Sequence, residues 1–388
     1  MELKRMTKKV DWTFVLALLV LLTVDLIVLT SASINVVDGQ PYYIVKKQLL
    51  WITGGLVLMA LVTLFWDYRN SEKVVHWLYL IAIVLLIGVL FMPEQKGAHR
   101  WYDLGFTDLQ PSELGKLIMI LAFAYFLSKR EKEMWEKRTL LTAILFMMLP
   151  AALVFIEPDL GTSLVYFMIF LGMVWVGGIR PRVMVIALGV IAVAILLFFT
   201  YLGILTDGFN KPLPDELPGF IPLKSYQVTR LIIFMNPYMD PLNTGYHMIQ
   251  SEVAIGSGGI FGKGWEQGSQ VQGDFLPEHH TDFIFSVVGE EFGFAGSIAL
   301  LGLYLFILWR AAKIAINAKD PLGRLIVTGV VSMLAFQLFI NVGMTIGIMP
   351  ITGIPMPFLS YGGSAMMVNL LAMGLILNVQ VRSREEIF

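Results

Sequence analysis

The sequence predicts an all-α polytopic membrane protein with about ten transmembrane helices, and composition alone already points to this class. Hydrophobic residues make up 57% of the 388 residues and charged residues only 15%, whereas soluble domains average roughly 25% charged residues. Mean hydropathy is +0.73. The apolar residues also gather into runs of near-membrane length.

Two absences narrow the function. The chain has no cysteine, which excludes disulfides and thiolate metal sites. Its net charge of −1 comes without a basic patch that could follow a phosphate backbone, so we expect no nucleic-acid partner.

The expected spans follow from the length that a bilayer requires, about 20 mostly apolar residues each. They are residues 13–34, 48–65, 74–91, 112–127, 139–155, 162–176, 183–202, 283–309, 325–346 and 356–379. The sixth is short. The first ends near Ser31-Ala32-Ser33, which weakly resembles a signal-peptidase site, but its apolar stretch is longer than a signal-peptide core. We therefore expect it to remain as the first span.

The distribution of Lys and Arg predicts the orientation. With a cytoplasmic N-terminus, 19 of the 28 basic residues lie inside and 8 outside, with Lys116 within a span. Both termini are then cytoplasmic, and the loops 93–111 and 203–282 are extracellular. We expect one integral membrane domain over residues 1–388.

The large extracellular loop between the seventh and eighth spans, 203–282, has 80 residues, far more than an ordinary connection. Four prolines make residues 207–222 an expected irregular stretch. Residues 225–255 are amphipathic and are expected to form short helices on the membrane surface.

Lys116 is an ionisable residue inside a span, where a charge costs about 2.5–3.5 kcal/mol. Glu113 lies three residues earlier, so the two side chains can meet on one helix face, and Pro111 marks the helix start. Two interpretations stay open. The pair neutralises itself so that the span can insert, or Lys116 binds an anionic group in an outward-facing cavity.

Two short loops carry further candidates. Arg100 lies beside Trp101, where an arginine can bind a phosphate through two hydrogen bonds, although interfacial aromatics are expected in any membrane protein. Glu157 and Asp159 flank Pro158 at the membrane surface. Asp159 is either the N-cap of the next helix or, with Glu157, an oxygen ligand of a divalent cation such as Mg²⁺ or Mn²⁺. No cofactor is identifiable from the sequence itself.

Residues 251–296 combine glycines, histidines and carboxylates directly before an apolar run. Asp282 lies at the start of that run, and two interpretations of it stay open. It is a helix N-cap with a lowered pKa, or a partly desolvated general base with a raised pKa. The adjacent His279 and His280 lack a zinc-binding pattern. Gly289 and Gly293 form a GxxxG face, expected to serve close packing.

Five motifs occur in order along the chain: GAHRWYDLGFTDLQPSELGK, EPDLGTS, GSGGIFGKGW, FLPEHHTDFIFSVVGEEFG and PFLSYGGSAMMVNLL. With them the chain resembles the SEDS family (shape, elongation, division and sporulation) over essentially its whole length. The GKGW, QGSQ and FLPEHHTDF motifs, together with Asp11-Trp12, resemble the rod-shape (RodA) branch more than the division (FtsW) branch. Gln272-Gly273-Asp274 departs from the family pattern and leaves that part of the loop open.

This resemblance implies a peptidoglycan glycosyltransferase that polymerises lipid II on the outer face of the bacterial cytoplasmic membrane. Asp282, in the family's HTDF motif, is implied as the general base for the GlcNAc 4-hydroxyl. That oxygen attacks C1 of a lipid-linked MurNAc, and undecaprenyl pyrophosphate leaves with inversion. Substrate-binding positions are implied at Arg100, Glu113, Lys116, Glu157, Asp159, Lys263, His280 and Ser360. The implied partner is a class B penicillin-binding protein.

Two other functions are compatible with the residues. A lipid II flippase would place ionisable groups near the midplane on several, often broken, helices. Here they gather toward the outer side, although the Pro-rich stretch 349–358 could be a broken or re-entrant segment. A non-catalytic scaffold for cell-wall enzymes would not need Asp282 for chemistry.

Overall fold

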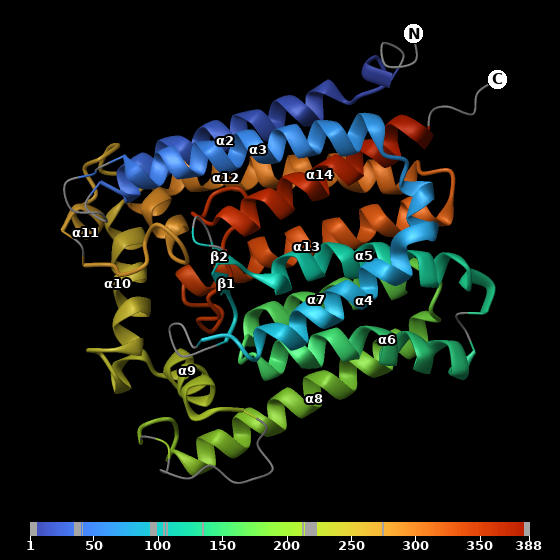
Figure 1. Ribbon diagram of the computed structural model, residues 1–388. Helices are drawn as coiled ribbons and strands as arrows, with labels where there is room; N and C mark the ends of the chain where they lie inside the picture. The colour runs from blue at the N-terminus through green and yellow to red at the C-terminus, as the bar shows by residue number, and fades with distance from the viewer. Residues whose placement is uncertain are drawn as a thin grey trace. The chain divides into compact units, whose positions relative to one another are not determined.

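The computed structural model describes residues 6–34, 40, 42–93, 99–103, 105, 108–133, 136–211, 213, 223–273 and 275–383 (Figure 1). Within these ranges almost all regular structure is helical. The two strands described, β1 (Tyr102–Asp103) and β2 (Asp108–Leu109), pair antiparallel with Tyr102 opposite Leu109. The predicted all-α class is confirmed.

Nine of the described helices are long and apolar enough to cross a membrane, so this is a multi-pass membrane protein. They are α2 (Trp12–Ala32), α3 (Tyr43–Phe65), α4 (Ser71–Val89), α5 (Pro111–Ser128), α6 (Lys137–Ile156), α8 (Pro181–Leu205), α12 (Ile284–Ile316), α13 (Pro321–Thr345) and α14 (Gly363–Ser383). The expected sixth span is α7 (Leu160–Val176), which is apolar but has only 17 residues.

Short-range signals fix several helix starts. Pro111 and Pro181 lie in the first turns of α5 and α8, where the missing N–H of proline costs nothing. Asp11 caps α2 by accepting a hydrogen bond from the N–H of Phe14 at 3.1 Å. These starts follow directly from local sequence.

The expected last span, 356–379, is wrong at its N-terminal end, because α14 begins only at Gly363. Pro355 and Pro357 remove two backbone donors, and Phe358 adopts a φ of +64°, which a helix cannot contain. The segment 346–362 is therefore irregular, and most of its second half is buried.

The chain divides into two compact units. The first comprises Met1–Ile179, Ala299–Leu338 and Pro355–Phe388, and the second Arg180–Ile298 and Phe339–Ile354. In the first unit α3 and α14 pack closely side by side (Figure 1). A Cβ at Gly374 would lie 3.0 Å from the backbone of Met59, so glycine allows the two helices to approach this closely without displacing backbone. In the second unit the expected short helices of 225–255 are α9 (Ser225–Met235) and α10 (Thr244–Ser257).

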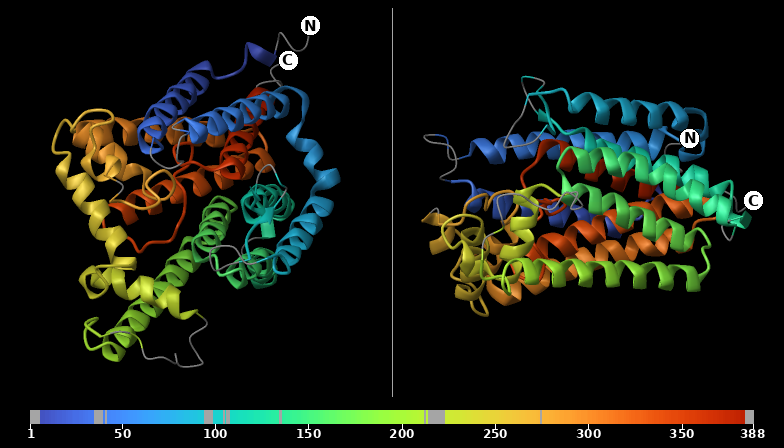
Figure 2. Two further views of the ribbon diagram at one scale, coloured as in Figure 1. Left: turned by 60° about the vertical axis from the view of Figure 1, so that its left-hand side comes forward. Right: turned by 90° about the horizontal axis from the view of Figure 1, so that it is seen from below.

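Helix α9 packs on the C-terminal end of α8, as Figure 2 shows. Leu202 of α8 and Val228 and Ile232 of α9 are fully buried there. The amphipathic pattern thus predicted helices correctly, while their place on a membrane surface stays a prediction. The expected irregular stretch 207–222 lies largely outside the described residues.

Candidate functional site

The nine candidate residues fall in both units, and each group is described within its own unit. The first unit holds Arg100, Glu113, Lys116, Glu157, Asp159 and Ser360; the second holds Lys263, His280 and Asp282.

Lys116 and Glu113 form the predicted ion pair on α5. Lys116 Nζ lies 2.7 Å from Glu113 Oε1, and their side chains are only 1% and 4% exposed. The second carboxylate oxygen of Glu113 and the hydroxyl of neighbouring Ser112 are buried without a hydrogen bond within the described chain. A paired but incompletely satisfied group in the span is able to accept a further donor.

The structure confirms one of the two roles predicted for Asp159, because this residue is the N-cap of α7. Its Oδ1 accepts a hydrogen bond from the N–H of Thr162 at 3.0 Å. Its Oδ2 accepts hydrogen bonds from the hydroxyl of Thr162 at 2.9 Å and from Gln110 at 3.1 Å. Both oxygens are engaged in fixing the corner between α6 and α7.

Arg100 reaches the same corner. Its Nε donates a hydrogen bond to the carbonyl of Glu157 at 3.2 Å, and its guanidinium also bonds the carbonyl of Pro158. Arg100 therefore ties the loop before β1 to the α6–α7 connection.

The Glu157 carboxylate is fully buried in this corner, and neither oxygen has a hydrogen bond in the described chain. Burial, reinforced by the nearby charge of Asp159 and opposed by Arg100, raises the pKa of Glu157 to about 8. A carboxyl group with this pKa is mostly protonated at neutral pH and is able to donate a hydrogen bond.

The corner offers little to a divalent cation. Oxygen-ligated cations take about six ligands, and only Glu157 here presents carboxylate oxygens without hydrogen bonds. Among the described residues no group of three or more His, Asp or Glu side chains is arranged to hold a metal ion. We therefore derive no step through one.

Ser360 belongs to a buried network that the sequence analysis missed. Gln48 of α3 donates hydrogen bonds to Asp25 of α2 at 3.1 Å and to the carbonyl of Ser360 at 3.3 Å. The Ser360 hydroxyl accepts the N–H of Met356 at 2.7 Å. Asp25 and Gln48 are fully buried. A carboxylate within the first apolar run was the available signal, because ionisable groups in spans are costly.

Asp282 lies in a turn of the second unit, two residues before α12 begins, and is half-buried. Asn341 of α13 donates a hydrogen bond to the carbonyl of Asp282 at 2.9 Å and another to the carbonyl of Ile354 at 2.8 Å. A Cβ at Gly353 would lie 3.4 Å from Asp282 Oδ2, and Gly353 has a φ of +71°. The carboxylate thus lies against a glycine backbone, and its main chain is anchored by a buried amide.

The histidines around Asp282 differ in environment. His279 is buried with its Nδ1 against the carbonyl of Leu276, whereas His280 is half-buried with its ring 5.7 Å from that of His279. His247 of α10, which the sequence analysis did not single out, stacks on Phe283 with ring centroids 6.0 Å apart. Burial lowers the pKa of His247, so it is neutral at pH 7.

Helix α12 is broken at Gly293, which has φ +65° and ψ −163°. The break removes the helical bonds that the N–H groups of Phe294 and Ala295 would make. These groups donate instead to the carbonyls of Gly259 and Ile260, each at 2.9 Å. In return, the N–H groups of Lys263 and Gly264 donate to the carbonyls of Glu290 and Glu291, each at 3.0 Å. The glycine-rich loop therefore replaces the lost helical bonds.

Lys263 is paired with a carboxylate that the sequence analysis did not assign. Its Nζ lies 2.6 Å from Glu290 Oε1, and the fully buried Glu290 also accepts the N–H groups of Gln270 at 2.9 Å and Val271 at 3.3 Å. Gly289 and Gly293 serve close packing as predicted, since a Cβ at either would lie under 3.0 Å from Ile255 or Gly262.

The fold and these sites define a class: a multi-pass helical membrane protein with an ion pair inside one span and an anchored carboxylate at the entry of another. The sequence matches the cell cycle protein family of FtsW, RodA and SpoVE over residues 11–385, and the chain belongs to that family.

Known relatives extend over nearly the whole chain. The peptidoglycan glycosyltransferase MrdB of Escherichia coli K12 is 37% identical over 375 residues, covering 96% of this chain and 94% of MrdB. A chain in a peptidoglycan synthase complex, solved to study the coordination of polymerization and crosslinking, superposes with a TM-score of 0.78 at 29% identity, covering 97% and 99%. The rod shape determining protein RodA of Thermus thermophilus superposes with a TM-score of 0.68 at 28% identity, covering 97% and 98%.

Proposed function

We propose that this protein is a peptidoglycan glycosyltransferase of the rod-shape branch, which polymerises lipid II during cell elongation on the outer face of the bacterial cytoplasmic membrane. The relative MrdB is named a peptidoglycan glycosyltransferase, which supports the proposed type of reaction. The single observation that supports the assignment of chemistry is the anchoring of Asp282 by Asn341 beside Gly353. A base must be held in place to accept a proton at the right moment.

In the proposed reaction Asp282 accepts the proton of the GlcNAc 4-hydroxyl of an acceptor lipid II. The oxygen forms a bond to C1 of the MurNAc at the lipid-linked end of the growing strand. The bond from C1 to the pyrophosphate oxygen breaks, its electron pair leaves with undecaprenyl pyrophosphate, and the anomeric carbon inverts. The leaving group is already a stable anion, so no acid is needed.

The remaining candidate residues have two kinds of proposed role. Lys116, held by Glu113, supplies positive charge toward the pyrophosphate. Arg100, Asp159, Lys263 and Ser360 make hydrogen bonds within the protein and position the loops around the substrate. Glu157 in its mostly protonated form is a hydrogen-bond donor, and His280 lies two residues from the base.

The proposed partners are lipid II, the lipid-linked nascent glycan, membrane lipid and a class B penicillin-binding protein that crosslinks the product. The structural neighbour from a peptidoglycan synthase complex supports such an assembly. Both termini are proposed to be cytoplasmic, with the loop 203–282 outside, and the whole chain is proposed to be one integral membrane domain.

The test is polymerisation of fluorescent lipid II by the purified protein with its penicillin-binding partner. Asp282→Ala and Asp282→Asn are expected to lower the rate by at least about 100-fold, the usual contribution of a general base. Glu266→Gln removes another half-buried acid from the same loop and should polymerise like wild type.

Folding and partner binding of each variant are checked by co-purification. If folded Asp282 variants polymerise as well as wild type, the base assignment is wrong. If the wild type moves lipid II across liposome membranes without polymerising it, the flippase hypothesis replaces the enzyme. The irregular segment 346–362 is the feature that would suit such a transporter.

A further inference from the structure

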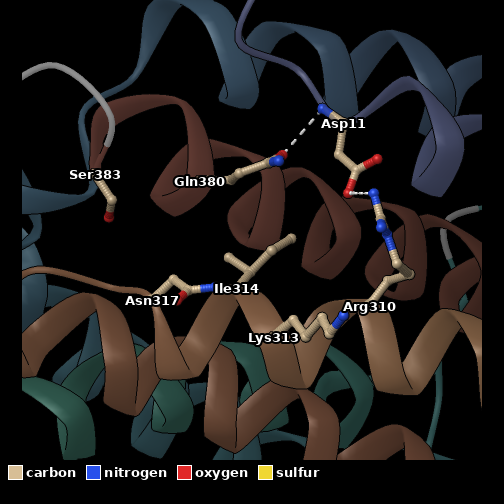
Figure 3. A pocket seen from close by; sticks show the side chains of 7 residues that line it. All are labelled: Asp11, Arg310, Lys313, Ile314, Asn317, Gln380 and Ser383. Carbon is tan, nitrogen blue, oxygen red and sulfur yellow. Dashed lines mark hydrogen bonds and ion pairs between the residues drawn. The ribbon is translucent and has the colours of Figure 1, made fainter.

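A cavity of about 150 Å³ with mostly polar residues around it lies in the first unit, and none of the nine candidate residues lines it (Figure 3). It is formed where α2 begins and where α12 and α14 end. Its lining residues are Asp11, Arg310, Lys313, Ile314, Asn317, Gln380 and Ser383. The proposed glycosyl transfer uses none of them.

Asp11 lines the cavity and makes three polar contacts there, and its charge is neutralised by Arg310. One carboxylate oxygen caps α2, and the other is paired with the guanidinium of Arg310 (Figure 3). Its backbone N–H donates to Gln380 Oε1 at 3.1 Å. Asp11, the one carboxylate among the described residues that line the cavity, is therefore fully engaged.

Two buried polar side chains of α14 that line the cavity have unused hydrogen-bonding groups. Gln380 is 6% exposed, and because its oxygen accepts from Asp11, its amide N–H₂ remains available. Ser383 is 8% exposed, and its hydroxyl has no hydrogen bond within the described part of the chain. A buried polar group without a partner destabilises the fold, so each such group calls for a ligand or water.

The charge of the cavity favours an anion. Among the described lining residues, Arg310 and Lys313 bring two positive charges against the single negative charge of Asp11. The Lys313 ammonium lies 3.8 Å from the ring centre of Trp309, which orients it without neutralising it. Asn317 adds another amide. Several N–H and O–H donors around a net positive charge match the oxygens of a phosphate group.

The position of the cavity narrows the source of that phosphate. Helix α2 starts at Trp12, and α12 and α14 end at Ile316 and Ser383, so the cavity lies at the level where spans leave the bilayer. Phospholipid phosphates occupy this level, and basic pockets between spans bind anionic headgroups. We propose that this cavity is a binding site for a phosphate group, supplied by an anionic phospholipid or by free phosphate.

The test compares wild type with Lys313→Gln, Ser383→Ala and the double variant. All three leave the Asp11–Arg310 pair and the proposed catalytic residues intact, so polymerisation should be unchanged. The matched control is Lys319→Gln, which removes an exposed lysine that does not line the cavity. Full-length protein in detergent is titrated with short-chain phosphatidylglycerol, with phosphatidylethanolamine and with inorganic phosphate. Binding is followed by native mass spectrometry and by thermal unfolding.

We expect wild type and Lys319→Gln to bind phosphatidylglycerol more tightly than phosphatidylethanolamine. Lys313→Gln should weaken this binding about fivefold, the effect of roughly one basic residue at an anionic surface. Saturable stabilisation by inorganic phosphate, lost in the double variant, would identify free phosphate as the source instead. The proposal is overturned if wild type binds neither phosphatidylglycerol nor inorganic phosphate. It is also overturned if the Lys313 and Ser383 variants bind both of these ligands as tightly as wild type does.

Discussion

The buried side-chain amide of Asn341 bonds the main chain of Asp282, with 2.9 Å between Asn341 Nδ2 and the Asp282 carbonyl oxygen. The same nitrogen bonds the carbonyl of Ile354 at 2.8 Å. One side chain on α13 thus joins the turn that carries the proposed base to the irregular segment opposite it. The carboxylate of Asp282 lies beside Gly353 of that segment, since a Cβ at Gly353 would be 3.4 Å from Asp282 Oδ2.

Replacing Asn341 with Leu should reduce both stability and turnover. The buried carbonyl of Ile354 and the partly buried carbonyl of Asp282 would lose their donor, at a cost of up to about 1–3 kcal/mol each, and the Asp282 turn would loosen. Thermal unfolding and lipid II polymerisation measure the two effects. The control is Gln337→Leu. Gln337 is a buried amide one helical turn before Asn341, and it makes no hydrogen bond to Asp282. Equal loss of turnover in both variants would contradict a positioning role for Asn341.

The ion pair of α5 allows its structural and functional roles to be separated. Lys116→Met leaves the buried Glu113 charge unpaired and should destabilise the protein by about 3–5 kcal/mol. Lys116→Met combined with Glu113→Gln removes both charges and should restore most of the thermal stability. If Lys116 acts on the pyrophosphate, the double variant stays inactive. An active double variant would show that the pair serves only insertion.

Glu157 should make stability depend on pH. Its pKa of about 8 lies above the ordinary value of 4.5, so the folded state holds this proton more tightly than the unfolded state. The contribution of Glu157 to the free energy of unfolding is on the order of a few kcal/mol. It is fully present below pH 4.5 and is lost as the pH rises through 8. Thermal unfolding between pH 5 and 9 should show this fall, and Glu157→Gln should flatten it. An equal slope in both proteins would refute the raised pKa.

The break in α12 should tolerate no side chain. Gly293→Ala places a Cβ 2.3 Å from the nitrogen of Gly262 in a backbone conformation that only glycine adopts readily. We expect a loss of at least about 2 kcal/mol. Gly302→Ala on the same helix meets open space and should be neutral or slightly stabilising. Unfolding temperatures of the two variants in one detergent make the comparison, and similar values would argue against strain at the break.

Sequence reasoning succeeded where the determining contacts are local. The apolar runs, the start of α5 at Pro111, the Asp159 cap and the Lys116–Glu113 pair depend on residues within a turn or two of each other. The late start of α14 was missed although its cause, two prolines, is also local. The prediction placed the helix start at residue 356 because it followed the length of the apolar run and not the two prolines.

The missed features depend on residues distant in sequence. Nothing near Asn341 reveals that it bonds a carbonyl 59 residues earlier, and the link from Gln48 to Ser360 spans 312 residues. Glu290 and Asp25 were detectable as carboxylates within apolar runs, but their partners were not. Resemblance to a family supplied the importance of Asp282, which its local pattern had left undecided between cap and base.

The exchange of hydrogen bonds at Gly293 also bears on how the second unit opens. The loop 258–264 is rich in glycine, and glycine-rich segments are usually flexible. Here, separating it from α12 would expose four bonded amides together, those of Lys263, Gly264, Phe294 and Ala295. The loop and the start of α12 should therefore behave as one cooperative unfolding unit. In amide hydrogen exchange its deuterium uptake would follow the slow kinetics of a helix.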